Sequence, residues 1–359
     1  MTARARDLGI PFSGSPGPLN AVTDVLGVEV GYTTLIEGAD VRTGVTALLP
    51  RGRSRIGDPC AAGWYSLNGN GEMTGTAWIE ESGTLDLPVT ITNTHAVGVA
   101  HAGTVSWVAG RRPDLAEGWL LPVAAETWDG YLNDINGGHV TEADVHAAID
   151  AAATGTPAEG SVGGGTGMNC YGFKAGSGTA SRVAETGSGA FTVGVFLQCN
   201  FGSRDQLVLG GIPLGREFAD DDPLGDLDRM APGSGSVIGV VATDAPLLPG
   251  QCKALARRVP LGLARTGTSG SHFSGDLFLA FSTANAGAFR TGWPASGDTA
   301  LGHVDFLQWG QIDPVYTAVV EAAEEAVANA LVAGREMIGL NGNRSPGLPL
   351  DAVRSRFAD

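Results

Sequence analysis

The chain has 359 residues, 43% of them hydrophobic, which is enough for a substantial core in one large domain or two ordinary ones. Its formal net charge of −16 argues against a nucleic-acid partner, because affinity for phosphate backbones comes largely from Lys and Arg. A charged fraction of only 17%, together with 55 glycines, excludes a coiled coil or a disordered tail and favours a loop-rich, layered α/β protein.

The cysteines occur singly, without a C-x-x-C pair or a dense framework, so we expect reduced thiols rather than a zinc ribbon or a disulfide scaffold. They are Cys60, Cys170, Cys199 and Cys252. The N-terminus lacks the apolar core of a signal peptide, and no stretch of about 18 apolar residues occurs anywhere in the chain. These features predict a cytoplasmic protein without a membrane partner.

Three elements are expected in the first half of the chain. Alternating hydrophobicity predicts a strand over residues 21–32 and a second over 88–92, which ends in the polar loop NTHAVG. Residues 141–153 carry an N-cap Thr141, acidic residues in the first turn and a stop at Gly155, which is typical of a short helix.

A glycine tract follows at residues 160–178. It lacks the G-K-[ST] ending of a phosphate-binding loop and has no clean G-x-G-x-x-G that opens a helix. The tract is better explained by turns and by close-packed backbone where only glycine fits.

Three apolar runs of strand length, at residues 191–198, 237–242 and 277–281, are typical of central strands covered by helices on both sides. The acidic, glycine-rich connection 218–234 is the strongest linker signal and ends directly at Gly235-Ser236. Its flanking strands are expected to share one core.

Two helices are expected near the C-terminus. Residues 249–258 form one that is closed by Pro260, and residues 314–337 form a long one with Pro at its start and Gly339 just past its end.

The Gly235-Ser236 pair suggests a self-activating nucleophile. If the Ser236 hydroxyl attacks the Gly235 carbonyl, the peptide bond becomes an ester, and water then releases a new N-terminus at Ser236. An α-amine has a pKa of about 7.7 to 8 and can serve as a general base, whereas an internal amide nitrogen cannot. Taken alone, the same GSGS stretch also fits a flexible loop that leads into a strand.

The surrounding sequence resembles the DmpA-type family of L-aminopeptidase/D-amidase/D-esterase enzymes and β-aminopeptidases. The stretch APGSGSVIGVVATDAPLLPGQCKALARR is similar to the start of the family's small subunit. The resemblance covers almost the whole chain, through RARDLGIPFSGSPGPLNAVTDVLGVEVGYTT, ITNTHAVG, ETWDGYLNDINGGHV, SVGGGTGMNCYGFKAGSGTASR, LQCNFGSR and SGDLFLAFSTAN.

This resemblance implies a self-cleavage site at Gly235-Ser236, with Ser236 as the nucleophile. Asn200 would be the oxyanion donor, a role suited to a rigidly held amide, although a turn residue at a strand end is the alternative. Ser274 and Asp276 would hydrogen-bond around the nucleophile and its amine. They also fit a turn and a strand cap, and some relatives have Glu in place of Asp276.

Glu126 resembles the family's carboxylate that receives the free amino group of the substrate, since an ammonium ion needs a charged acceptor. A structural or solvated Glu is the alternative. No cofactor or metal is implied, and the six histidines show no tight ligand spacing.

The resemblance also implies a four-layer αββα sandwich, similar to N-terminal-nucleophile hydrolases in its layers. Residues 1–359 would form one domain, divided by cleavage into a large subunit, 1–235, and a small subunit, 236–359, with several such pairs in a homo-oligomer.

The expected activity is hydrolysis of amide and ester bonds next to a free N-terminal amine, in small peptides, amino-acid amides or esters. The alternatives are a related oligoamide hydrolase or acyltransferase, and an uncleaved, inactive homologue that acts as a binding protein.

Overall fold

The computed structural model describes residues 3–225, 235–291 and 301–358, and it contains two mixed β-sheets. The four-stranded sheet has the order β1-β2-β5-β6, with β5 and β6 parallel and the other pairs antiparallel. Its strands are β1 (Glu29–Glu37), β2 (Val41–Leu49), β5 (Val89–Asn93) and β6 (Val123–Thr127).

The six-stranded sheet has the order β4-β3-β12-β11-β10-β9, in which only β11 and β12 are parallel. Its strands are β3 (Cys60–Ser66), β4 (Thr84–Leu85), β9 (Ser177–Thr186), β10 (Gly189–Asn200), β11 (Gly235–Thr243) and β12 (Ser274–Ser282). Two short hairpins complete the strands: β7 (Asn169–Cys170) with β8 (Phe173–Lys174), and β13 (Met337–Ile338) with β14 (Arg344–Ser345).

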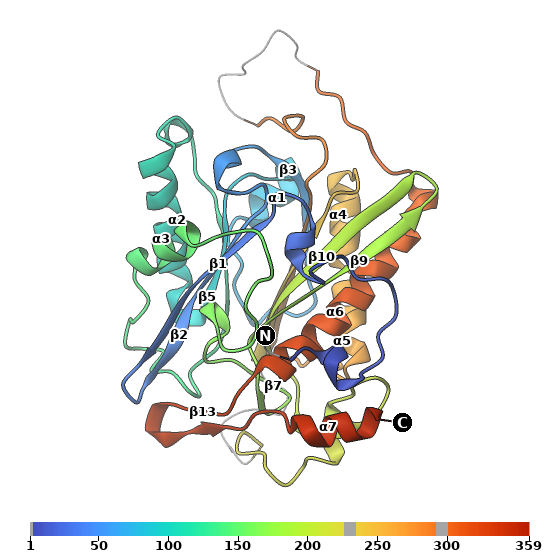
Figure 1. Cartoon of the computed structure of the whole chain (residues 1–359). Helices are drawn as coiled ribbons and strands as arrows, with labels where there is room; N and C mark the ends of the chain where they lie inside the picture. Colours follow the sequence, from blue (N-terminus) through green and yellow to red (C-terminus); the bar gives the residue numbers. More distant parts are fainter. Residues whose placement is uncertain (1–2, 226–234, 292–300, 359) are drawn as a thin grey trace.

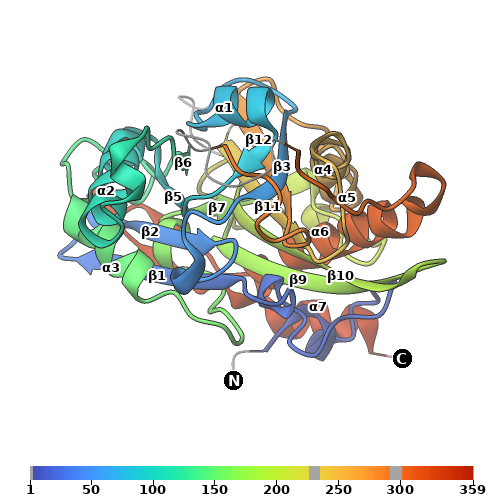
Figure 2. The ribbon, with the colours of Figure 1, turned by 90° about the horizontal axis from the view of Figure 1, so that it is seen from above.

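Helices cover the outer faces of both sheets. The helices of the described residues are α1 (Thr76–Ser82), α2 (Val97–Arg111), α3 (Glu142–Asp150), α4 (Pro249–Ala256), α5 (Val259–Arg265), α6 (Asp313–Ala333) and α7 (Leu350–Phe357). Seen from above, α2 and α3 lie on one side of the molecule and α4, α5 and α6 on the other, with the sheets between them (Figure 2). The long hairpin of β9 and β10 packs against α6 (Figure 1).

Three hydrophobic layers hold these elements together. Between the two sheets, Ile91 of β5 belongs to the same buried cluster as Phe196 of β10 and Ile238 of β11. A second cluster joins the six-stranded sheet to α4, α5 and α6, and a third joins the four-stranded sheet to α2 and α3. The result is the four-layer αββα sandwich that the sequence predicted.

The strands predicted at residues 191–198, 237–242 and 277–281 lie within strands of the structure, and the one predicted at 88–92 matches β5 except for Pro88, which precedes it. The strand predicted from residue 21 begins only at Glu29. Val22–Asp24 is instead a 3-10 turn, because the Asp24 carboxylate accepts hydrogen bonds from the backbone N–H groups of Leu19 and Ala21.

The predicted helix ends need correction. The first helix has Thr141 as its N-cap, as expected, but ends at Asp150. Pro260 lies in the first turn of a separate helix, α5, and not just after α4 as predicted. Proline is tolerated there because the N–H groups of a first turn have no hydrogen-bond partner within the helix. The last long helix ends at Ala333, and Gly334 passes so close to Lys174 that a Cβ there would lie 1.9 Å from the Lys174 carbonyl oxygen.

The glycine tract packs as expected for backbone that excludes side chains. A Cβ on Gly164 would lie 2.3 Å from Gln198 Oε1, and one on Gly165 would lie 2.5 Å from the Ser177 nitrogen. These contacts bring the tract against β9 and β10. Of the predicted acidic connection, residues 226–234 lie outside the described part of the chain.

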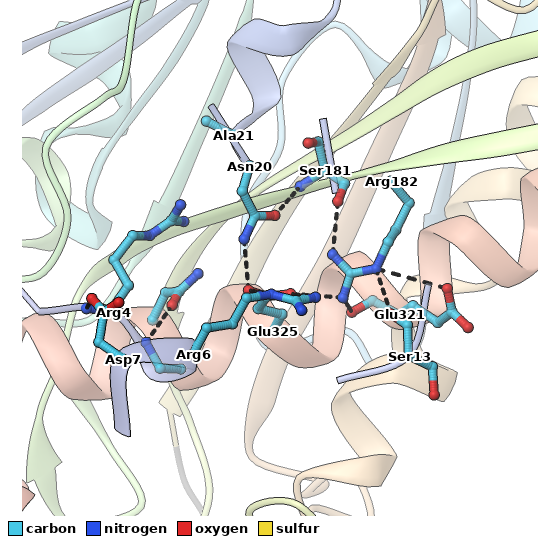
Figure 3. A network of polar contacts seen from close by, with 12 residues as sticks. Arg4, Arg6, Asp7, Ser13, Asn20, Ala21, Ser181, Arg182, Glu321 and Glu325 are labelled. Atoms are coloured by element: carbon cyan, nitrogen blue, oxygen red, sulfur yellow. Dashed lines mark hydrogen bonds and ion pairs between the residues drawn. The ribbon is translucent and has the colours of Figure 1, made fainter. Parts of the chain in front are cut away.

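A buried ionic cluster ties the N-terminal segment to α6 (Figure 3). Glu325, with no exposed side-chain surface, accepts two hydrogen bonds from Arg6 at 2.8 Å, one from Asn20 Nδ2 at 2.6 Å and one from Arg182 Nη2 at 2.7 Å. Burial alone would raise the pKa of Glu325, but the hydrogen bond from Arg6 and the charge of Arg182 lower it below its ordinary value. We call these four residues the Glu325 cluster.

We expect Glu325→Gln to lower the free energy of unfolding by about 3–5 kcal/mol, because it removes the charge that compensates the buried Arg182. The loss should appear as a lower urea midpoint at pH 7. Since the Glu325 pKa is lowered on folding, this stabilisation is present above the ordinary carboxyl pKa and disappears as the pH falls through the lowered value.

The matched control is Glu324→Gln on the same helix. Glu324 pairs with the half-exposed Arg265 at 3.0 Å, and such pairs contribute no more than about 1 kcal/mol. Equal midpoints for the two variants would contradict the role given to the Glu325 cluster.

Candidate active site

The predicted nucleophile lies at the start of a central strand. Gly235 and Ser236 are the first residues of β11, which lies between β10 and β12 in the six-stranded sheet. Ser236 stands opposite Asn200 of β10 and opposite Gly275 of β12. The fold therefore brings the predicted residues of three separate segments to adjacent strand ends.

The Ser236 hydroxyl is held against the peptide that precedes it. Ser236 Oγ donates a hydrogen bond to the Gly235 carbonyl oxygen at 2.7 Å, and the Gly275 N–H donates to Ser236 Oγ at 3.2 Å. Only 3% of Ser236 is exposed. A serine hydroxyl that is buried and fixed beside its own preceding carbonyl is suited to attack within the chain.

Gly235 is required by the backbone at this point. Its φ of +147° lies in the region that L side chains rarely adopt, and a Cβ would lie only 1.9 Å from the carbonyl oxygen of Asn200. The close approach of β10 and β11 at this position therefore excludes every other residue.

Ser274 and Asp276 form a buried pair at the start of β12. Ser274 Oγ donates to Asp276 Oδ1 at 2.5 Å, and Asp276 Oδ2 accepts from Asn68 Nδ2 at 2.8 Å. Burial raises the pKa of Asp276, while the hydrogen bonds from Ser274 and Asn68 oppose that rise. Both carboxylate oxygens are thus fixed by donors.

Asn200 holds a fixed side-chain orientation at the end of β10. Its Oδ1 accepts from the Asn169 N–H at 2.9 Å, and its Nδ2 donates to the Trp128 carbonyl at 2.8 Å. An amide nitrogen has two hydrogens, so one remains beyond the bond to Trp128. With 6% exposure, Asn200 is a rigid donor beside Ser236.

A buried lysine supports the segment that orients Asn200. Lys174, with no exposed surface, donates to the Met168 carbonyl at 2.7 Å and the Ala175 carbonyl at 2.8 Å. Met168 precedes Asn169, whose N–H binds Asn200. Burial lowers the pKa of Lys174 to about 7, and it raises that of the neighbouring Asp129 to about 7.

Glu126 approaches the site from the other sheet. It lies near the end of β6, is 1% exposed, and accepts hydrogen bonds from the Glu72 N–H at 2.8 Å and from the Thr94 hydroxyl. Burial raises the pKa of this carboxyl. Gly71 lies between Glu126 and Gly275, the residue whose N–H binds Ser236. A Cβ on Gly71 would lie 3.3 Å from Glu126 Oε1 and 2.9 Å from the Gly275 Cα.

All six residues predicted for the site thus lie around the start of β11. Sequence reasoning missed Asn68, Thr94 and the buried Lys174. Asn68 belongs to the SLNGNG loop that directly follows a buried strand, and loops of this kind often carry functional side chains. Its contact with Asp276 spans 208 positions in the chain, and no local sequence pattern encodes that.

Within the described ranges, no group of three or more His, Cys, Asp or Glu side chains could hold a metal ion. The helices described there are also too short or too polar to cross a membrane. The four cysteines are buried and free.

Comparison with known proteins identifies the family. The model for Peptidase family S58 matches residues 20–345. The chain belongs to this family. β-Peptidyl aminopeptidase BapA of Sphingosinicella microcystinivorans is 48% identical over 99% of this chain and 92% of its own length, and BapA of Sphingosinicella xenopeptidilytica is 42% identical over 98% and 90%.

Solved structures agree with this assignment. The L-aminopeptidase D-Ala-esterase/amidase of Ochrobactrum anthropi, described as a prototype for the serine aminopeptidases and a new variant among the Ntn hydrolase fold, superposes with a TM-score of 0.91. It is 46% identical, over 99% of this chain and 98% of its own. A Burkholderia sp. β-aminopeptidase gives a TM-score of 0.89 at 44% identity, over 98% of both chains.

These findings confirm the predicted fold class and the predicted family. The chain is a hydrolase of the aminopeptidase type, and its family supports peptides as substrates.

We expect Gly235→Ala to displace the start of β11, because the added Cβ cannot coexist with the Asn200 carbonyl oxygen. Ser236 then loses its position beside the Gly235 carbonyl. The purified variant should remain a single chain by mass spectrometry and should show no peptide hydrolysis above background.

Gly250→Ala in α4 is the control, because a Cβ there meets nothing within 4 Å. A Gly235→Ala protein that is cut and as active as the Gly250→Ala protein would show that this backbone constraint has no role in function.

Proposed function

We propose that this chain cuts itself between Gly235 and Ser236, and that Ser236 then hydrolyses amide and ester bonds next to a free N-terminal amine. The contact of 2.7 Å between Ser236 Oγ and the Gly235 carbonyl oxygen carries this proposal. The products of the cut are a large subunit, residues 1–235, and a small subunit, residues 236–359.

Cleavage begins when Ser236 Oγ attacks the carbonyl carbon of Gly235. The bond from that carbon to the Ser236 nitrogen breaks, an ester to Oγ forms, and the nitrogen becomes a free amine. Water then hydrolyses the ester and leaves a carboxylate on Gly235. The new amine has an unperturbed pKa of about 7.7 to 8 and can take the hydroxyl proton in later turnovers.

In turnover, the same hydroxyl attacks the substrate carbonyl and forms an acyl-enzyme, which water hydrolyses. We assign Asn200 the role of donating its remaining amide hydrogen to the oxyanion that develops on the substrate carbonyl. Such a donor accelerates the reaction because it is already in position before the transition state forms. The Ser274 hydroxyl donates to Asp276, and in this proposal its oxygen accepts a hydrogen bond from Ser236 or from the new amine.

Glu126 receives the substrate ammonium group in this proposal. Two features of Glu126 support the assignment. It is buried, and a partly dehydrated carboxylate favours a positive partner. It also lies close to Gly275, whose N–H binds Ser236. The two BapA relatives are named for β-peptidyl substrates and the Ochrobactrum enzyme for an ester and an amide, so we include β-amino-acyl, D-amino-acyl and ester substrates.

We also propose that the subunit pairs assemble into a homo-oligomer. Exposed apolar side chains such as Trp119 at 55% exposure and Trp309 at 56% are the surface residues that such an interface would cover.

The first expected outcome is that purified active protein consists of two pieces, 1–235 and 236–359. Ser236→Ala should remain one chain and lose activity at the same time, because one hydroxyl serves both reactions. Intact-mass measurement and a peptide assay on the same sample test this.

Ser236→Thr is the informative companion, since it keeps a hydroxyl and should retain some cleavage. An active preparation that contains only the 36.6 kDa chain would exclude self-processing. An uncut and inactive wild-type protein would favour a binding function.

The second expected outcome concerns the substrate amine. An aminoacyl anilide with a free amine should exceed its N-acetyl derivative by at least about 100-fold in kcat/KM, about 3 kcal/mol, because the blocked amine leaves Glu126 without a charged partner. Glu126→Gln should narrow this ratio. The raised pKa of Glu126 also predicts that the ratio falls in acid, as the carboxylate becomes protonated.

Glu81→Gln, an exposed change in α1, should leave the ratio unchanged. Equal rates on blocked and free substrates would eliminate the aminopeptidase role of Glu126 while leaving Ser236 as the nucleophile.

A further inference from the structure

The segment after β3 continues along the start of β12, where the reactive residues lie. The Leu67 N–H donates to the Asp276 carbonyl at 3.0 Å, and the Asn70 N–H donates to the Ser274 carbonyl at 3.2 Å. Ser66, the last residue of β3, stands opposite Leu277. Residues 67–70 therefore hold a fixed position beside Ser274 and Asp276.

Asn68 is the residue of this segment that faces Asp276. Its Nδ2 donates to Asp276 Oδ2 at 2.8 Å and to the Ser271 carbonyl at 2.9 Å, and its Oδ1 accepts from the Asp276 N–H at 2.6 Å. Both amide hydrogens and the amide oxygen are engaged. The Asn68 side chain thus binds both the backbone N–H and the carboxylate of Asp276.

The Asp276 carboxylate depends on these neutral donors. It is 4% exposed, and across the described ranges no Lys, Arg or His forms an ion pair with it. A buried carboxylate without a cation remains charged only where hydrogen bonds replace water. Ser274 supplies one such bond and Asn68 supplies the other.

The orientation of these bonds matters for Ser274. Because the Ser274 hydroxyl hydrogen points to Asp276 Oδ1, the Ser274 oxygen can accept a hydrogen bond from the nucleophile or its amine. A protonated Asp276 could donate to Ser274 instead and reverse this arrangement. Whatever keeps Asp276 ionised and in place therefore keeps Ser274 an acceptor.

We propose that Asn68 is a positioning residue, which holds Asp276 as the ionised acceptor of the Ser274 hydroxyl and thereby orients Ser274 toward Ser236. This inference rests on the proposed function of Ser236. Asn68 touches neither substrate nor reacting atoms in this role.

Few other groups act on Asp276. Ionisable side chains on neighbouring segments include Tyr65 of β3, His272 and Glu72, whose N–H binds Glu126, and the Ser236 amine would join them after the proposed cleavage. The causes that act on the pKa of Asp276 are burial, which raises it, and hydrogen bonds from Ser274, Asn68 and the Val237 backbone, which lower it. Loss of the Asn68 donor should therefore raise this pKa further.

The test is the pH dependence of kcat/KM with a free-amine aminoacyl anilide as the probe. Activity should fall in acid as Asp276 becomes protonated, and Asn68→Ala should move this acid limb upward by about one pH unit, the size expected for one lost hydrogen bond to a carboxylate. A purely structural role would lower activity at all pH values without moving the limb.

Asn68→Asp gives a second measure. It is nearly isosteric and keeps an acceptor for the Asp276 N–H, but it loses both amide donors and adds a like charge, so the limb should move at least as far. This variant carries the test if Asn68→Ala does not fold. If either variant is cut only slowly, the same shift should appear in the pH dependence of its cleavage rate.

The matched control is Asn70→Ala, two residues along the same segment. Asn70 is exposed, and among the described residues its side chain donates only to the Phe273 carbonyl, so its loss should leave the acid limb in place. An unchanged limb in folded Asn68 variants, or an equal shift in Asn70→Ala, would overturn the role of Asn68. Hydrolysis that persists in Ser236→Ala would instead overturn the function on which this role rests.

Discussion

The candidate site depends on the close approach of β10 and β11 at Gly235. The Asn200 carbonyl leaves no room for a side chain there, and the two strands stay paired to the last residue of β10 and the second residue of β11. That register places Ser236 opposite Asn200, and the parallel pairing with β12 places Gly275 on its other side. One contact between two backbones thus positions Ser236, the proposed nucleophile, beside the Asn200 amide and the Gly275 N–H.

The central position of β11 gives this arrangement its rigidity. A strand with a neighbour on each side has both edges of its backbone paired, and packed helices and a second sheet restrict it further. The side chains around Ser236 are buried and have hydrogen-bond partners, with Glu126 brought in from the other sheet. The residues of the candidate site therefore lie mainly on strands of the two packed sheets and not on a surface loop.

Much of this could be predicted from the sequence, for identifiable reasons. Apolar runs such as residues 191–198 and 277–281 show central strands directly, because both faces of these strands are buried. Element ends were harder to predict. The turn at Asp24 depends on local side-chain hydrogen bonds that hydrophobic alternation does not show, whereas the end of α6 at Gly334 depends on contact with the distant Lys174. Asn68 was missed for the same reason, since its partner lies in β12.

The Glu325 cluster joins residues on opposite sides of the Gly235-Ser236 bond. Arg6, Asn20 and Arg182 come before that bond and Glu325 after it, so a cut there turns an internal ionic cluster into an interface between two polypeptides. Ser236 of β11 lies opposite Asn200 of β10 only once these two strands have paired, so an unfolded chain cannot assemble the site. Activation by cleavage would then depend on folding, because only a molecule with both sheets formed could cut itself. The uncut precursor would have no hydrolase activity before that point.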